Sequence, residues 1–423
     1  MMNLLFLATA VAVIGVMVQL CPIKFLIPES LHINSTLTPS LGMVGLKRFG
    51  GEYPSGFRGG NVTINVGPLG YILIVRPNIP TAASHGQKDD DITDWVNENT
   101  DWLNTHIVEY GGVLLREFNV VSVFEFDDIV GTIHSDANGT GIYLGTAPRA
   151  RVPNTRFVST ASEIPKIFSI PTHLELCFTP NPPPRLYFYA GKPNTPPGGQ
   201  TPFTDFRQVW RDMSPDLKNK LLSRGLVYQR RYFNARPKMR FRSQKAWNLD
   251  AMQHKSWQDM YGTYNKTIVE EMSREQQFTP IWDTKFNLLL THHAEVAKQH
   301  PITGEEYFST HFNVLHASTH IVPYLWDAQL FNSRKSLLVG GLITLITQLR
   351  LLIGYPYGHD MIHRDTGTSV SYEDGITIRQ MILRNTWQFD WNEGDVMMLD
   401  NLRMAHGRTP WFDGDRRVYV AWG

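Results

Sequence analysis

His406 and the arginine pair Arg416-Arg417 near the end of the chain have the residue types of a metal-dependent site. A neutral imidazole nitrogen binds a divalent metal ion, and an arginine guanidinium binds a carboxylate through two parallel hydrogen bonds. Because the arginines follow the histidine by ten and eleven residues, one of them could lie on the next stretch of strand. The pattern suggests a metal ion with a carboxylate-bearing cosubstrate, and it requires further metal ligands upstream.

Four histidines are followed two residues later by a carboxylate, the spacing that a metal-binding strand requires. Residues i and i+2 of a strand face the same side, so both side chains can reach one ion. Two histidines and one carboxylate hold Fe(II) in one class of non-haem oxygenases and leave open positions on the metal. The candidate pairs are His134 with Asp136, His173 with Glu175, His293 with Glu295, and His363 with Asp365.

The sequence that follows His173 and Glu175 favours this pair. Leu186–Ala190 is a predicted strand, and residues 193–199 are a predicted turn rich in proline and glycine. Thr201 comes next, with a hydroxyl that could bond a bound carboxylate. This segment therefore offers two metal ligands and one hydroxyl near the expected cosubstrate.

The other pairs have less suitable surroundings. His134 leads into a turn-forming segment, where a strand is not expected. His363 lies 43 residues before His406, whereas several strands of about 5–6 residues and their loops need on the order of 50 residues. His293 follows a predicted strand at Leu288–Leu290, and spacing does not exclude it.

The set of motifs resembles the TauD/TfdA group of Fe(II)/2-oxoglutarate dioxygenases, and more narrowly its His-x-Glu branch, which includes clavaminate-synthase-like proteins. The similarity covers roughly Thr93 to Trp422 and departs from the family at Glu117, where the family usually has glycine. The number and order of the motifs make the match specific. The matching segments are Gly111–Phe118, His173–Glu175, Gly198–Pro202, Ser256–Gln258, Gly262–Thr263, His300–Glu305, Phe312–Asn313, Gly394–Val396, His406–Arg408 and Arg416–Arg417.

The resemblance implies three iron ligands: His173, Glu175 and His406. It also implies that Arg417 binds the distal carboxylate of 2-oxoglutarate and that Thr201 assists. Arg416 is expected to be a solvated neighbour of Arg417.

Further residues of the site are less closely defined by the sequence. Asp400 and Asn401 could orient His406 by hydrogen bonding, and a turn that bonds its own backbone is an equally good interpretation. Asn313 and Arg403 are candidates to face the substrate, with a structural role equally open.

The resemblance also implies a reaction. With Fe(II), 2-oxoglutarate and O₂, such a protein oxidises an aliphatic C–H of a small molecule, such as an amino-acid-like substrate, by hydroxylation, desaturation or oxidative cyclisation. Succinate and CO₂ are released. Halogenases of the wider superfamily lack the ligand carboxylate, so Glu175 argues against halogenation. The alternative is a catalytically silent jelly-roll protein that binds a ligand or serves as a membrane-tethered scaffold.

Composition limits the protein classes that fit. The 423 residues are 42% hydrophobic, enough for a sizeable core, and the formal net charge is +1. The basic residues are dispersed, so we expect no nucleic-acid partner. With two cysteines, Cys21 and Cys177, a disulfide scaffold is excluded and a reducing compartment fits.

The first residues form a separate hydrophobic segment. Leu4–Leu20 is almost wholly apolar, and Lys24, Lys47 and Arg48 follow it. We expect a membrane anchor, with a cleaved peptide for organelle targeting or secretion as the alternative and the membrane side left open. A second apolar stretch, Leu337–Ile353, is expected to be a buried helix, and a membrane-contacting helix is the alternative.

The expected fold is α+β and mainly β, with a double-stranded β-helix (jelly-roll) core, flanking helices and an N-terminal hydrophobic helix. We divide the chain into residues 1–22 (anchor or targeting segment), 23–92 (lead-in) and 93–423 (catalytic domain). A strand is predicted at Tyr71–Val75. A helix is predicted after Thr93, with hydrophobic residues at helical spacing as far as Ile107, and it leads into a strand at Val113–Leu115.

Overall fold

The computed structural model describes residues 32–33, 39–78, 92–134, 149–162, 164–179, 181–194, 198–234, 256–310, 312, 322–352 and 359–423. The predicted N-terminal hydrophobic helix and Asn313 lie outside these residues.

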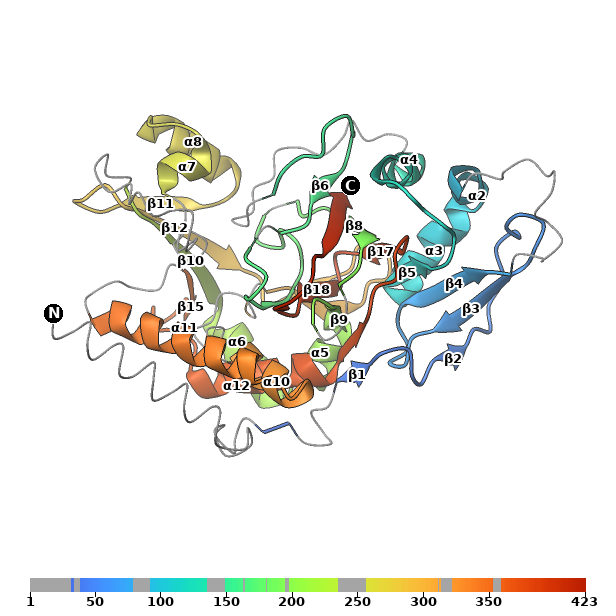
Figure 1. Cartoon of the computed structure of the whole chain (residues 1–423). Coiled ribbons are helices and arrows are strands. Elements are labelled where there is room, and N and C mark those ends of the chain that lie inside the picture. The colour runs from blue at the N-terminus through green and yellow to red at the C-terminus, as the bar shows by residue number, and fades with distance from the viewer. Residues whose placement is uncertain are drawn as a thin grey trace.

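Two sheets pack face to face at the centre of the molecule (Figure 1). Phe203 and Met404 of the smaller sheet pack in one hydrophobic cluster with Phe188 and Val420 of the larger sheet. The larger sheet has the order β2 (Lys47–Arg48), β3 (Val62–Val66), β4 (Leu73–Pro77), β5 (Gly112–Leu115), β17 (Val396–Asp400), β8 (Arg185–Lys192), β19 (Arg417–Trp422), β6 (Ser159–Thr160). The smaller sheet has the order β1 (Ser40–Leu41), β16 (Thr386–Phe389), β9 (Thr201–Asp205), β18 (Met404–Arg408), β7 (Ile170–His173).

Strand β17 shows why the larger sheet is apolar on both faces. Its side chains alternate between two clusters, as the two-residue period of a strand requires. Met397 and Leu399 face the smaller sheet, whereas Val396 and Met398 pack with residues of the helices on the other side. These helices are α2 (Ile92–Glu98), α3 (Thr100–Tyr110) and α4 (Val123–Ile133). The result is a helix layer on one face of the sheet and the interior between the two sheets on the other.

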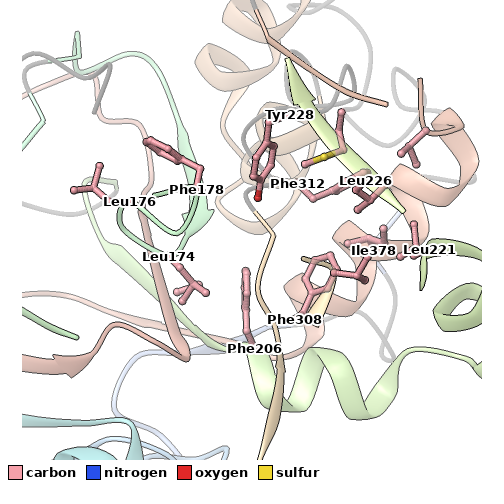
Figure 2. Close-up of a cluster of buried hydrophobic side chains, with 14 of the residues drawn as sticks. Leu174, Leu176, Phe178, Phe206, Leu221, Leu226, Tyr228, Phe308, Phe312 and Ile378 are labelled. Carbon is pink, nitrogen blue, oxygen red and sulfur yellow. The ribbon is translucent and has the colours of Figure 1, made fainter. Parts of the chain in front are cut away.

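A long insertion between β9 and β16 forms a second lobe with its own hydrophobic cluster (Figure 1). In Figure 2, Leu174 and Leu176 contribute to this cluster together with Tyr228 and Phe206, so the chain on either side of Glu175 is fixed by packing. The strands of the insertion are β10 (Leu226–Tyr232), β11 (Thr279–Trp282), β12 (Leu288–Ala294), β13 (Ala297–Gln299), β14 (Glu306–Phe308) and β15 (His359–His363). Its helices are α5 (Phe206–Asp212), α6 (Pro215–Arg224), α7 (Trp257–Tyr261), α8 (Lys266–Glu275), α10 (Val322–Leu330), α11 (Arg334–Leu352) and α12 (Tyr372–Arg384).

The mixed α/β architecture agrees with the predicted fold class, and two facing sheets are consistent with a jelly roll. The predicted strands at Val113–Leu115, Leu186–Ala190 and Leu288–Leu290 are present as β5, β8 and β12. The predicted helix is interrupted at Asn99, whose side-chain amide donates to the carbonyl of Trp95. Strands β2 to β4 of the predicted lead-in join the larger sheet, so this part is continuous with the remaining fold.

The described part of the predicted apolar helix, Leu337–Leu352, belongs to α11, which packs against α10. Leu337 is buried there with Leu325 and Trp326 of α10. Among the described residues, no helix combines the length and hydrophobicity needed to cross a bilayer. The predicted membrane segment, Leu4–Leu20, lies outside the described residues, so the expected membrane association stays a prediction.

Candidate metal centre

The pairing of β7 with β18 brings two histidines together. His173 and His406 are direct partners across these antiparallel strands, and their ring centroids lie 4.6 Å apart. His173 Nδ1 lies 2.9 Å from the carbonyl oxygen of Pro171. If Nδ1–H donates to this carbonyl, Nε2 keeps its lone pair free for a metal ion. The strand register thus gives one histidine on each strand a ring nitrogen directed to a common point.

Glu175 follows β7 and completes a cluster of three ligand-type side chains. Its Oε2 lies 4.0 Å from His173 Nε2 and 3.7 Å from His406 Nε2. One ligand atom from each residue lies within 4.8 Å of the others. Two metal–ligand bonds of about 2.1 Å could span the two carboxylate–imidazole distances. Two imidazoles and a carboxylate are a donor set that suits Fe(II) and leaves coordination positions for other molecules.

The protein environment sets the ionisation of this cluster so that it can bind a cation. Burial lowers the pKa of His173 to about 4 and also lowers the pKa of His406, so both imidazoles are neutral at pH 7. Burial opposes ionisation of Glu175, but the guanidinium of Arg149 and the two histidines hold its pKa well below the usual range. The three residues therefore present two nitrogen lone pairs and one negative charge to a metal ion.

Asn401 fixes the backbone of Glu175. Its Oδ1 accepts from the Glu175 N–H at 2.8 Å, and its Nδ2 donates to the carbonyl oxygens of Glu175 at 2.9 Å and Pro183 at 2.8 Å. Of the two interpretations left open for Asp400 and Asn401, the hydrogen bond to His406 is not found in the described part of the chain, whereas Asp400 Oδ1 accepts from the Leu402 N–H of its own turn at 3.2 Å. His406 Nδ1 has no hydrogen-bond partner among the described residues.

Asp400 belongs to a different contact. Its carboxylate lies 2.9 Å from His300 Nε2, and both side chains are fully buried. His300 Nδ1 accepts from the backbone N–H groups of Ile302 and Thr303, so Nε2 carries the ring proton and lies against the Asp400 carboxylate. This pair ties the turn after β17 to the insertion, which explains why Asp400 is not available to His406.

Replacing Asn401 with leucine is expected to lower the free energy of unfolding by about 3 kcal/mol. The change leaves the N–H and C=O of Glu175 buried without partners, and each such loss costs about 1–3 kcal/mol. Urea denaturation of the metal-free protein measures the effect. Asn401→Asp retains the acceptor for the Glu175 N–H, and it should be destabilised by less than the leucine variant. Equal stability of wild type and Asn401→Leu would show that these hydrogen bonds add nothing.

The structure reverses the expected positions of the two arginines. The side chain of Arg417 is 63% exposed and pairs at 3.4 Å with Asp415, which is 53% exposed. Arg416 is partly buried, and its Nη2 donates to Thr201 Oγ1 at 3.2 Å. Strand alternation explains the difference, because Val418 and Val420 face the interior between the sheets and Arg416 continues this face. Arg416, and not Arg417, therefore lies beside Thr201.

Thr201 was predicted to lie near the cosubstrate, and the structure places it in the same sheet as His406. It begins β9, is buried, and its Oγ1 also accepts from Trp391 Nε1 at 2.9 Å. Phe203, two residues further along β9, is the direct partner of His406 on β18. Residues two apart on a strand share a face, and so do direct cross-strand partners. Thr201 and His406 therefore face the same side of the smaller sheet.

Arg403 was predicted as a possible substrate contact, and the structure instead gives it a structural role. Its side chain is fully buried, and Nη2 contacts Asp205 Oδ2 at 2.9 Å. Nη1 donates to the carbonyl oxygens of Val108 and Glu109 at the end of α3. These contacts connect α3 to the smaller sheet. Asn313, the other predicted substrate residue, lies outside the described residues.

Of the rival histidine–carboxylate pairs, Asp136 of the His134 pair lies outside the described residues, and the other two pairs form no metal cluster in the described part of the chain. His293 and Glu295 are exposed beside a cleft of about 290 Å³. His363 is buried, whereas Asp365 is half exposed and pairs with Arg224. The cluster of His173, Glu175 and His406 is the one group of three or more such ligands found among the described residues.

Sequence reasoning did not identify Arg149, whose Nη2 lies 2.6 Å from Glu175 Oε2. It also gave no role to Trp391, the donor to Thr201. No local motif marks either residue, because each reaches the site from a distant segment. The alternation of Arg416, Val418 and Val420 is a signal for Arg416 in the sequence, but an ambiguous one, because Ala421 on the opposite face is apolar as well.

Comparisons with known proteins assign the family. A model described as taurine catabolism dioxygenase TauD, TfdA family, matches residues 78–422. The chain is 23% identical to the dapdiamide synthesis protein DdaC of Enterobacter agglomerans, over 74% of this chain and 82% of that protein. It is also 23% identical to a clavaminate synthase-like protein of Arabidopsis thaliana, over 78% of this chain and 86% of that protein. Among solved structures, PvcB of Pseudomonas aeruginosa aligns with a TM-score of 0.45 and 12% identity, over 88% of this chain and 94% of that one. The chain belongs to the TauD/TfdA family and is an Fe(II)- and 2-oxoglutarate-dependent dioxygenase.

Proposed function

We propose that the protein oxidises an aliphatic C–H bond of a small molecule by hydroxylation, desaturation or oxidative cyclisation. In this proposal His173, Glu175 and His406 hold Fe(II), while Arg416 and Thr201 bind the distal carboxylate of 2-oxoglutarate. The proposal transfers the carboxylate-binding role, which the sequence had suggested for Arg417, to the neighbouring arginine that faces the interior.

The observation that carries the proposal is the environment of Arg416. Desolvation lowers the pKa of its guanidinium to about 9, and the nearby positive charge of Arg408 adds to this effect. Among the described residues, no carboxylate forms an ion pair with Arg416, and its enclosed Nε has no hydrogen-bond partner. A desolvated cation without a counter-ion is unfavourable, so a bound dianion such as 2-oxoglutarate would stabilise it.

The strand register supports a single binding site for the metal ion and this dianion. Thr201 lies two residues, about 7 Å of extended strand, from the partner of His406. That separation suits a five-carbon diacid with one end at the metal ion and the other at Arg416. Thr201 Oγ1 already accepts from Trp391, and its own hydrogen is available for donation to a carboxylate.

The residues of the site have distinct roles in the proposed reaction. Iron and 2-oxoglutarate, when bound, supply the oxidising power through decarboxylation of 2-oxoglutarate by O₂ to succinate and CO₂. His173 and His406 remain neutral and Glu175 remains ionised, so no proton has to leave before the metal ion binds. The ring centroid of Phe188 lies 5.1 Å from that of His406, so an apolar side chain of the larger sheet packs against this ligand.

Succinate release tests the proposal. We expect purified protein with Fe(II), 2-oxoglutarate and O₂ to form succinate faster when a fraction of a metabolite extract contains the substrate. Mass spectrometry of that fraction would show a gain of one oxygen for hydroxylation, or a loss of two hydrogens for desaturation or cyclisation. Iron-independent ligand binding without succinate formation, across a broad substrate panel, would instead support the silent ligand-binding alternative.

A further inference from the structure

A buried arginine holds the carboxylate of the proposed iron ligand Glu175. Arg149 Nη2 lies 2.6 Å from Glu175 Oε2, and the two side chains are 7% and 4% exposed. The same oxygen is the one closest to His173 Nε2 and His406 Nε2. Arg149 therefore acts on the oxygen that faces both histidines.

Arg149 is anchored independently of Glu175. Its neighbour Ala150 accepts from the Thr160 N–H at 2.7 Å and donates to Thr160 Oγ1 at 2.9 Å, and Thr160 belongs to β6 at the edge of the larger sheet. The guanidinium lies 5.6 Å from the ring centroid of Trp422, a position that favours a cation–π contact. Arg149 is thus held in place at the edge of the larger sheet, and its guanidinium contacts the carboxylate of Glu175, which follows β7 of the smaller sheet.

The length of glutamate makes such a contact useful. Glutamate has one more rotatable bond than aspartate, so holding its carboxylate in one orientation costs more side-chain entropy. The hydrogen bonds of Asn401 reach the backbone of Glu175, so they do not themselves restrict rotation of its carboxylate. A hydrogen bond from Arg149 restricts that rotation and also provides a counter-charge for a buried anion between two neutral imidazoles.

We propose that Arg149 is a positioning residue for the metal centre. It selects the orientation in which Glu175 presents Oε2 to the ion bound by His173 and His406, and it keeps this carboxylate in place before the ion arrives. The inference rests on the proposed iron ligands, and it adds an electrostatic partner from outside the ligand set. Removing a residue that hydrogen-bonds to a metal ligand typically weakens metal affinity by about 10–100-fold.

Metal binding to the metal-free protein tests this role without turnover. Co(II) titration calorimetry, in the absence of 2-oxoglutarate, should show affinity about 10–100-fold weaker for Arg149→Met than for wild type. Arg149→Lys should recover part of the loss, because it retains the charge but not the planar donor group. The visible absorption of bound Co(II) should change in Arg149→Met, since it reports how Glu175 coordinates the ion.

Arg151→Met is the matched control. Arg151 is exposed two residues away and donates to the carbonyl oxygens of Thr155 and Arg156, so its loss should change Co(II) affinity by less than about twofold. Circular dichroism shows whether each variant is folded. If Arg149→Met is not folded, the Co(II) affinity of Arg149→Lys is compared with that of wild type instead. Unchanged or tighter Co(II) binding by Arg149→Met would overturn the inference, and tighter binding would mean that Arg149 competes with the ion. A wild-type protein that binds no Co(II) would overturn the proposed metal site as well.

Discussion

Replacing Arg416 with alanine is expected to raise the 2-oxoglutarate concentration for half-maximal succinate formation at least about 30-fold. Truncating one member of a buried, hydrogen-bonded charge pair costs about 2–5 kcal/mol, and 2 kcal/mol corresponds to about 30-fold in affinity. The matched change Arg417→Ala should alter this concentration by less than about twofold, because Arg417 is exposed and contacts Asp415. Initial rates of succinate release over a range of 2-oxoglutarate concentrations measure both effects.

The stability of the two variants provides the control. Arg416 has no carboxylate partner among the described residues, so its loss should not destabilise the protein without 2-oxoglutarate. Added 2-oxoglutarate with a non-reactive metal ion should raise the melting temperature of wild type and Arg417→Ala, and much less that of Arg416→Ala. A large loss of 2-oxoglutarate affinity in Arg417→Ala, with Arg416→Ala unaffected, would return the binding role to Arg417.

The arginine pair shows where sequence information was sufficient and where it was not. Spacing from His406 placed an arginine near the expected cosubstrate but could not choose between neighbours that face opposite sides of a strand. Both faces of β19 are largely buried, since Ala421 packs beneath the helices and Val420 packs between the sheets. The hydrophobic pattern was therefore ambiguous, and a register shift between Arg417 and Val418 adds to the difficulty.

The metal ligands were more predictable because their spacing has a direct geometric meaning. A His-x-Glu segment at the end of a strand supplies two ligands locally, and the resemblance pointed to His406 as the third. Arg149 and Asn401 could not be predicted in the same way, since they reach Glu175 through long-range packing. Arg403 and Asp400 illustrate the converse: polar residues close in sequence to His406 are used to connect α3 and the insertion to the sheets.

Glu175→Ala is expected to weaken Fe(II) binding by more than about 100-fold and to abolish succinate formation. The change removes the negative charge of the donor set, an effect larger than the 10–100-fold cost of losing a residue that only supports a ligand. The rival pair provides the matched control, because Glu295 is also a glutamate two residues after a histidine. Glu295→Ala should retain metal affinity and 2-oxoglutarate-dependent turnover within about twofold if that exposed carboxylate has no role in the site.

The comparison distinguishes the two sites directly. Calorimetric titration of metal-free protein with Fe(II) under anaerobic conditions gives the affinities, and succinate release gives turnover. Full binding and turnover in Glu175→Ala, together with their loss in Glu295→Ala, would place the iron at His293 and Glu295 instead. The structure argues against that result, because Glu175 is buried between two neutral imidazoles and is held by Arg149 and Asn401. His293 and Glu295 have no third metal-ligating partner among the described residues, so a stable iron centre there would lack the donors that it needs.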